Sequence, residues 1–186
     1  MRFPRYNDPA KLFETRQGRC GEWANAFALV CRAMGFETRY VLDFTDHVWT
    51  EVYIESSGRW IHCDSCEGPD ALDKPLLYET GWGKKLTYVL AFADCGVADV
   101  SRRYTSNYAE LLTRRNLARE NWLISTIFVV NGKLRESLPT AMRKFYVERD
   151  LNEVADMNGE KKNDGLSARK SGSIDWKFKR GEMGPQ

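Results

Sequence analysis

The stretch GRCGEWAN, residues 18–25, opens an apolar helical pattern from which the fold of this chain can be worked out. From Cys20 to Met34, apolar side chains occur on most sides of the expected helix, and Gly35 is a typical residue just after a helix end. A helix that is apolar nearly all round is usually buried among other elements. The pattern therefore predicts a central helix with Cys20 in its first turn.

The position of Cys20 matters for its chemistry. The partial positive charge at a helix N-terminus favours the thiolate over the thiol, and the thiolate is the nucleophilic form. From composition alone, a helix cysteine is more often a small buried hydrophobe. Cys20 becomes a candidate nucleophile only if the fold brings a base to it.

Strand-like runs follow the helix. Tyr, Val, Trp and Ile are frequent in residues 37–42, 47–54 and 59–64, and the sequence ESSG at 55–58 predicts a hairpin turn. Further strands are predicted near 86–92 and 96–100, and helices after Tyr104 and over 134–154. An antiparallel sheet with the cysteine helix packed on it and helices behind it is an α+β fold.

The predicted hairpin brings a histidine close to a carboxylate. Side chains alternate along a strand, so every second residue from His47 to Tyr53 shares one face, as do Trp60, His62 and Asp64. Pairing Tyr53 with Gly58 places His47 opposite Asp64, and a shift of two residues keeps them diagonal neighbours on one face. For Cys20 to meet His47, we expect the helix to pack on that face.

A thiol, an imidazole and a carboxylate can together carry acyl transfer. The sulfur attacks a carbonyl carbon, and the imidazole deprotonates the thiol and later protonates the leaving nitrogen. The carboxylate orients the imidazole and stabilises its charged form. The predicted set is Cys20, His47 and Asp64. His62 is the alternative base, but a cross-strand partner of Asp64 is easier to orient than a residue two positions away.

Neighbouring residues could in principle form a metal site or a substrate cleft. Cys63 and Cys66 have zinc-type spacing beside His62, but the chain holds no second CxxC pair, so we expect no metal there. Large aromatics near strands are more often core than cleft. Four tryptophans and one acid could nevertheless line a sugar- or peptide-binding cleft. We predict that Trp23, Trp49 and Glu67 bind substrate, with Trp60 and Trp82 as further walls. The pairs Lys84-Lys85 and Arg114-Arg115 are expected to be solvated.

Composition limits the possible functions. The chain has 186 residues, 42% of them hydrophobic, which is enough for an ordinary globular core. Its 28 basic and 26 acidic residues give a net charge of only +2, so no domain-wide basic excess points to nucleic acid. The five cysteines suggest no disulfide framework, and no run has the length of a membrane span. We expect a protein of the cytosol.

Several motifs in the right order resemble the cytosolic peptide:N-glycanases, a family of the transglutaminase-like superfamily. They are GRCGEWAN at 18–25, DHVWTE at 46–51, DSCE at 64–67, KPLLYE at 74–79, GWGKKL at 81–86 and SGSIDW at 171–176. The resemblance is dense up to about residue 115 and sparse from there to 170. It implies a transglutaminase-like, papain-like core.

The resemblance also implies an activity. Such an amidase cleaves the bond between asparagine and the innermost N-acetylglucosamine of N-glycans on misfolded glycoproteins returned to the cytosol. By motif match Cys20 is the nucleophile, His47 the base and Asp64 the orienting acid, and Glu67 falls at a position implicated in substrate binding. Family members carry a structural zinc on two CxxC pairs upstream of the nucleophile. We expect these pairs to lie before residue 1, with no cofactor in this chain itself.

The predicted organisation has three parts: a catalytic core over 1–103 that is incomplete at its N-terminus, a helical extension over 104–155, and over 156–186 a linker and the start of a further domain. Proteasome-shuttle and AAA-ATPase partners are implied by the resemblance, and the helical region is a candidate surface for them. The alternatives are a crosslinking transglutaminase or cysteine protease using the same three residues, or a non-enzymatic transglutaminase-like interaction module.

Overall fold

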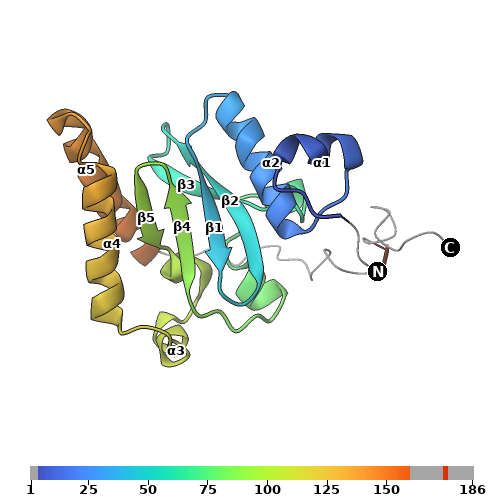
Figure 1. Cartoon of the computed structure of the whole chain (residues 1–186). Coiled ribbons are helices and arrows are strands. Elements are labelled where there is room, and N and C mark those ends of the chain that lie inside the picture. The colour runs from blue at the N-terminus through green and yellow to red at the C-terminus, as the bar shows by residue number, and fades with distance from the viewer. Residues whose placement is uncertain (1–3, 160–173, 176–186) are drawn as a thin grey trace.

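The computed structural model describes residues 4–159 and 174–175 and contains a five-stranded antiparallel sheet with helices on both faces (Figure 1). The strands are β1 (Thr38–Asp43), β2 (His47–Ile54), β3 (Arg59–Cys63), β4 (Val89–Ala93) and β5 (Gly96–Asp99), in the spatial order β3-β2-β1-β4-β5. The predicted α+β class is confirmed. The part of the predicted linker beyond Gly159 lies almost entirely outside the described residues.

Two helices precede the sheet, α1 (Pro9–Thr15) and α2 (Cys20–Ala33). α1 begins after Asp8, whose side chain accepts a hydrogen bond from the Ala10 N–H. In the first turn of α2 the Glu22 carboxylate accepts the N–H of Arg19. Gly35, with φ of 86°, follows the helix end in the left-handed region that glycine adopts readily. The local signals thus place both ends of α2 within one residue of the prediction.

α2 is not the central helix that its apolar pattern predicted. It packs on one face of the sheet, where Cys31 and Phe27 contact Val52. On its outer side Val30 is 36% and Met34 71% exposed. An all-round apolar surface buries a helix only when elements surround it, and the main packing partners of α2 in the described part of the chain are the sheet and α1.

The hairpin register differs by two residues from the favoured pairing. Ile54 pairs with Arg59 and Tyr53 with Trp60, so the four turn residues 55–58 lie outside the ladder. The predicted turn is confirmed, but pairing Tyr53 with Gly58 is wrong, because it would place a turn residue inside the strand. In the observed register His47 and Asp64 are the diagonal neighbours that the two-residue shift described.

α2 also lies on the opposite face from the one expected. Thr50 of β2 donates its hydroxyl hydrogen bond to Ala24 O, and Thr50 alternates with Trp49 and Glu51, which point to the other side. The expectation that α2 packs on the His47 face is therefore wrong. Cys20 and His47 are the first residues of α2 and β2, so the two side chains can meet beyond the strand end without crossing the sheet.

The part of the chain after β3 supplies short helical segments and three α-helices. They are the 3-10 helices η1 (Pro69–Ala71) and η3 (Ser101–Tyr104), the π-helical turn η2 (Leu77–Gly81), and α3 (Tyr108–Thr113), α4 (Glu120–Leu134) and α5 (Thr140–Asn158). The helix predicted over 134–154 begins at Thr140 because Pro139 is suited to a helix start and not to a helix interior. None of the described helices is both long and apolar enough to cross a membrane.

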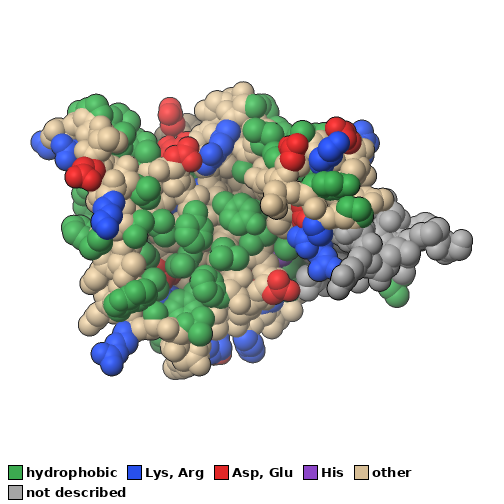
Figure 2. All heavy atoms as spheres, in the orientation of Figure 1, with side chains coloured by type: hydrophobic (Ala, Val, Ile, Leu, Met, Phe, Trp, Pro, Cys, Tyr) green, Lys and Arg blue, Asp and Glu red, His purple; other side chains and the backbone are tan. Residues whose placement is uncertain are grey.

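The main core lies on the sheet face that carries His47. Trp49, Tyr78 and Tyr104 are fully buried there and pack with aliphatic residues of β1, β4 and the segment after β5. The opposite face carries an exposed apolar surface between α2 and α4, visible in Figure 2. Phe44, Phe92 and Trp122 line a cavity of about 400 Å³ there.

α4 and α5 hold the sheet from two sides (Figure 1). Asn131 of α4 accepts the N–H of Val97 and donates to its carbonyl oxygen, which caps the free edge of β5. Glu153 of α5 binds Arg39 of β1 from the core side. The helical extension is thus packed on the sheet, while its description as a separate domain remains a prediction.

Candidate active site

His47 is positioned by the tight turn before it. The loop 44–46 joins β1 to β2, and Asp46 takes a left-handed φ of 71° at its end, as expected for a three-residue hairpin loop. Asp43 accepts hydrogen bonds from the N–H and hydroxyl of Thr45, which stabilises the turn. His47 consequently lies opposite Asp43 with its ring on the core face.

His47 and Asp64 form a short buried hydrogen bond. The distance from His47 Nε2 to Asp64 Oδ2 is 2.7 Å, and the two side chains are 3% and 1% exposed. Asp64 follows directly after β3, and its other oxygen accepts the N–H of Cys66 at 2.8 Å. The carboxylate is therefore fixed on both sides and holds the imidazole in one orientation.

Cys20 approaches His47 from the N-terminus of α2. Burial raises the pKa of the Cys20 thiol, but the hydrogen bond and charge of His47, together with the backbone N–H groups of Val48 and Gly21, outweigh it, so the pKa lies below its ordinary value. A lowered pKa increases the thiolate fraction near neutral pH. The structure brings Cys20, His47 and Asp64 together, as the sequence predicted.

The pKa of the His47 imidazole shifts in the opposite direction, upwards. Burial lowers the pKa of His47, but the hydrogen bonds from its ring to Asp64 and Cys20 and the charges of both partners raise it to about 9. Burial raises the pKa of Asp64, while the hydrogen bond and charge of His47 bring it below the ordinary value. The lowered pKa of Cys20, the raised pKa of His47 and the lowered pKa of Asp64 each favour the charged form: thiolate, imidazolium and carboxylate.

Behind Asp64 lie Tyr78, for which the sequence predicts no role, and His62, the alternative base. The Tyr78 hydroxyl donates to Asp64 Oδ2 at 2.9 Å, and the same hydroxyl oxygen is 2.7 Å from His62 Nε2. His62 therefore faces Tyr78 and Ala71 O, whereas His47 is the histidine bonded to Cys20. Tyr78 belongs to the KPLLYE motif at 74–79, but no periodicity places its hydroxyl at the site.

The residues predicted to bind substrate have different environments. Trp49 is 0% exposed and stacks on Tyr78 at 4.3 Å between ring centroids, so its predicted substrate contact is contradicted by burial. Trp60 is also buried, with the Arg39 guanidinium over its ring. Trp23 is half-buried and donates to Gly18 O at the start of α2. Trp23 remains a prediction.

Glu67 is buried rather than solvated, and its N–H donates to Asp64 O. It lies three residues after the carboxylate that holds His47, which is compatible with its predicted role. Trp82 is half-buried, and its ring meets the His47 ring edge-on at 5.0 Å. Trp82, which was considered only as a cleft wall, thus covers the imidazole.

Two expectations for basic residues are wrong. Lys84 is not a solvated loop residue: its ammonium group binds the fully buried Asp43 carboxylate, one strand away from His47. Arg115 has no exposed side-chain surface and pairs with Asp99 and Glu120. Both are ordered because a buried carboxylate or hydroxyl requires a hydrogen-bonding partner, which the charge pattern of a sequence does not reveal.

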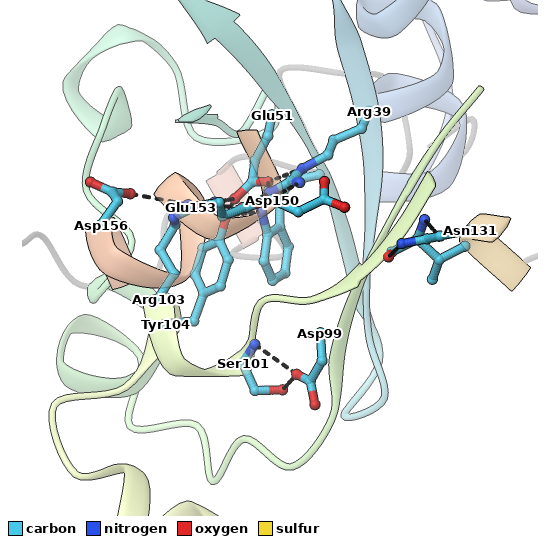
Figure 3. A network of polar contacts seen from close by, with 12 residues as sticks. Arg39, Glu51, Asp99, Ser101, Arg103, Tyr104, Asn131, Asp150, Glu153 and Asp156 are labelled. Atoms are coloured by element: carbon cyan, nitrogen blue, oxygen red, sulfur yellow. Dashed lines mark hydrogen bonds and ion pairs between the residues drawn. The ribbon is translucent and has the colours of Figure 1, made fainter. Parts of the chain in front are cut away.

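A second polar cluster lies on the same sheet face (Figure 3). Glu51 of β2 is fully buried and binds Arg39 of β1, Arg103 of η3 and the Tyr104 hydroxyl. Glu153 of α5 binds Arg39 from the other side. We call these five residues the Glu51 cluster. Burial raises the pKa of Glu51, but the charges of Arg39 and Arg103 outweigh it and bring it to about 2.

The Glu51 cluster was not predicted from the sequence, although one signal for it was present. Glu51 is an acid at an inward strand position between the aromatic residues Trp49 and Tyr53. A carboxylate in such a position needs a cation, and Arg39 is its direct cross-strand partner. Glu153, more than a hundred residues away, could be found only from the fold.

The cysteines and histidines of this chain do not fit a zinc ion. Cys63 is buried against Cys31 and Val52 on the α2 face, and burial raises its pKa to about 12, which disfavours the thiolate a metal requires. In the described part of the chain no group of three or more His, Cys, Asp or Glu side chains could hold a metal ion. All five cysteines are free.

Two family models match the chain. Residues 1–65 match the core of the transglutaminase-like superfamily, and residues 43–158, more than half of the chain, match the Rad4 transglutaminase-like domain. The first match contains Cys20, His47 and Asp64.

Curated relatives are similar over nearly the whole chain. The chicken (Gallus gallus) peptide-N(4)-(N-acetyl-beta-glucosaminyl)asparagine amidase is 54% identical over 100% of the chain, and the human protein of that name is 53% identical over 100%. The relative of that name from the yeast Yarrowia lipolytica is 43% identical over 99%. The chain spans 28% of the length of the chicken and human proteins and 52% of the yeast protein.

Solved structures with a similar fold are more distant in sequence. A crystal structure of Rad4–Rad23 bound to a 6-4 photoproduct UV lesion superposes with a TM-score of 0.56 at 18% identity, over 82% of this chain and 38% of that one. Rad4–Rad23 crosslinked to undamaged DNA gives a TM-score of 0.57 at 16% identity, over 86% and 39%. This likeness concerns the fold alone.

Proposed function

The chain belongs to the transglutaminase-like superfamily through its Rad4 transglutaminase-like domain, and from this premise we propose that it forms the catalytic core of a peptide:N-glycanase. The reaction is hydrolysis of the amide bond between an asparagine side chain and the innermost N-acetylglucosamine of an N-glycan. The observation that carries the proposal is the joined set of Cys20, His47 and Asp64 in a chain 54% identical to an amidase of that name.

The proposed mechanism uses these three side chains. The Cys20 thiolate attacks the carbonyl carbon of the glycosylated asparagine, and the His47 imidazolium gives its proton to the departing nitrogen. A thioester forms and a glycosylamine leaves. Water, deprotonated by His47, then attacks the thioester and releases the Cys20 thiolate and an aspartic acid, which loses its proton to the solvent; thiolate and imidazolium are thereby regenerated. Asp64 holds the imidazole orientation throughout. The partial positive charge at the α2 N-terminus favours the thiolate at the start.

The test compares the 186-residue chain, alone and in place of the matching segment of the chicken relative, with its Cys20→Ala variant. The substrate is a denatured N-glycosylated protein, and the readouts are loss of the glycan on a gel and conversion of asparagine to aspartate by mass spectrometry. We expect the chimera to deglycosylate the substrate and the Cys20→Ala chimera not to. Equal activity of the two, or an inactive folded chimera, would overturn the proposal.

Other acyl-transfer reactions on the same three residues are the alternative enzyme classes. A crosslinking transglutaminase would incorporate an amine into a glutamine peptide, and a cysteine protease would cleave an unglycosylated peptide. Supplying the chimera with these substrates beside a glycopeptide separates the three. A purely non-enzymatic interaction module would act on none of them, although Cys20, His47 and Asp64 are all present.

The setting of this activity is also part of the proposal. We place the protein in the cytosol, acting on misfolded glycoproteins, with a structural zinc held by cysteine pairs of a preceding segment and not by this chain. Proteasome-shuttle and AAA-ATPase partners remain a proposal that rests on the family resemblance. Copurification of such partners with the full-length protein, and zinc content of the chimera compared with the isolated chain, would test these points.

A further inference from the structure

A buried chain of polar contacts runs away from Asp64 into the core. Asp64 Oδ2 lies 2.9 Å from the Tyr78 hydroxyl, that oxygen lies 2.7 Å from His62 Nε2, and His62 Nδ1 lies 3.1 Å from Ala71 O. Tyr78 and His62 are 0% exposed. Water therefore cannot replace a missing partner, and each contact must be satisfied by a proton of these groups.

When His62 is neutral, this row of three polar contacts has one proton too few for each contact to be a hydrogen bond. Ala71 O can only accept, so its contact needs a proton on Nδ1, and the Asp64 carboxylate also only accepts. The remaining proton is that of Tyr78, which faces two acceptors, Asp64 Oδ2 and the lone pair of His62 Nε2. It can donate to one of them at a time. The three contacts are all satisfied only when a second proton stands on His62.

The shared proton matters because Tyr78 and His47 both donate to Asp64 Oδ2. Two donors to one oxygen compete, since each reduces the negative charge that the other meets. When Tyr78 donates to Asp64, the carboxylate stabilises the His47 imidazolium less. When Tyr78 donates to His62, the full charge of Oδ2 is available to His47.

We propose that Tyr78 and His62 are positioning residues for Asp64, and that the direction of the Tyr78 hydroxyl proton sets how strongly Asp64 holds the His47 imidazolium. The inference deepens the proposed amidase function and rests on it for the reaction. The contacts themselves do not depend on the substrate. His62 acts only through Tyr78, and Tyr78 acts only through Asp64.

The charges around His62 favour its neutral form. Burial lowers the pKa of His62, and the charges of Asp64, Glu51 and Asp73 and the Ala71 carbonyl oppose this without overcoming it. Glu51 is itself paired with Arg39 and Arg103, which reduces its effect. The titratable groups hydrogen-bonded to His47 are Cys20 and Asp64, and the rings of Trp49, Tyr78 and Trp82 surround the rest of its ring. At neutral pH one of the three contacts among Asp64, Tyr78, His62 and Ala71 O therefore lacks a proton, and the Tyr78 hydroxyl proton has two acceptors.

Two substitutions should shift the pH at which His47 titrates in opposite directions. Tyr78→Phe removes the competing donor from Asp64 Oδ2, so the His47 titration should move up by about half to one pH unit. His62→Gln places an amide N–H near the position of Nε2. This group donates to Tyr78, directs the tyrosine proton onto Asp64 and should move the His47 titration down by about as much. The double variant should behave as Tyr78→Phe.

The readout is ¹⁵N NMR of the two imidazoles in the 186-residue chain, which contains only His47 and His62. The ring shifts report both protonation and tautomer, and the His62→Gln spectrum assigns them. We expect His62 to be neutral with its proton on Nδ1 at pH 7. Tyr53→Phe is the matched control, because Tyr53 lies on the same face of β2, packed on Trp60, and should leave the His47 titration unchanged.

Shifts of the same sign in the two single variants, or none, would overturn the proposal, as would a proton on Nε2 of His62 in the unsubstituted chain. The last observation compares no titration shifts between variants, so it decides even if Tyr78→Phe fails to fold. No glycan substrate is used. If the amidase assay fails but the His47 titration shifts in opposite directions in Tyr78→Phe and His62→Gln, the proposed function is refuted and the positioning role of Tyr78 and His62 is retained.

Discussion

The sheet face that carries His47 holds two buried polar clusters of different chemistry. The site around Asp64 consists of groups that can gain or lose a proton: a thiol, two imidazoles, a phenol and a carboxylate. The Glu51 cluster consists of two guanidinium groups that never lose their protons, two carboxylates and one phenol. One cluster can therefore move protons during a reaction, whereas the other can only hold elements together.

Trp49 lies between the two clusters and contacts both. Its ring stacks on Tyr78, and its Nε1–H donates to the Tyr104 hydroxyl at 2.7 Å, which in turn donates to Glu51 at 2.6 Å. The residues of the motif DHVWTE at 46–51 therefore divide by side-chain chemistry. His47 is the acid and base of the proposed reaction, Trp49 fills the core, and Glu51 binds Arg39 of β1 and Arg103 of η3.

The largest expected effect is a loss of turnover when His47 is replaced. His47→Ala should lower turnover by roughly a thousandfold to ten thousandfold, because the general acid and base are lost. His62→Ala should retain part of the turnover, because His62 reaches the site only through Tyr78. The measurement is kcat for glycopeptide hydrolysis by the chimera. The reverse order of the two variants would show that the base was assigned to the wrong histidine.

The second prediction concerns the stability contributed by the Glu51 cluster. Glu51→Gln leaves Arg39 and Arg103 buried with too little negative charge, and we expect the free energy of unfolding to fall by about 3–5 kcal/mol. Urea denaturation measures this. Glu55→Gln, in the exposed hairpin turn, is the matched control and should change stability by less than about 0.5 kcal/mol. Equal small effects would mean that Glu153 alone neutralises the arginines.

Acid should distinguish the clusters by the protons they bind. The pKa of Glu51 is lowered from 4.5 to about 2, so its contribution is present above pH 4.5 and is lost as the pH falls towards 2. We expect roughly 3 kcal/mol of acid-dependent stability from this group. Glu51→Gln should flatten the acid side of a plot of unfolding free energy against pH.

The Cys20–His47 pair should give two opposing slopes. The pKa of His47 is raised from 6.5 to about 9, so its contribution to stability is present below pH 6.5 and is lost as the pH rises towards 9. The pKa of Cys20 is lowered from 9.0, so its contribution is complete above pH 9 and is lost as the pH falls. In Cys20→Ala only the His47 contribution remains, and the free energy of unfolding should fall as the pH rises towards 9.

The smallest effect concerns the loop that covers His47. Lys84→Met leaves the buried Asp43 carboxylate with only the Thr45 donors, and we expect a loss of about 1–3 kcal/mol. Lys85→Met is the matched control because Lys85 is its exposed sequence neighbour. Thermal unfolding of the two variants checks this. Similar values would mean that the Asp43–Lys84 pair adds nothing to the stability of the loop.

Much of the fold and of the site could be predicted from local patterns. The ends of α2, the strands and the hairpin turn follow from capping, alternation and turn residues, which act over a few positions. The pairing of His47 with Asp64 survived a register error of two residues, because a shift of two preserves the face of a strand. A shift of one would have destroyed it.

The sequence alone determined which chemistry is available: a thiol at a helix start, and a histidine and a carboxylate with matching strand parity. Only the tertiary structure decided that α2 packs on the opposite face, that Trp49 is buried, and that Tyr78, Glu51 and Lys84 have buried partners. The physical reason is range. Periodicity and capping depend on neighbours along the chain, whereas the burial of a polar group depends on residues such as Glu153, which the sequence separates from Arg39 by 114 positions.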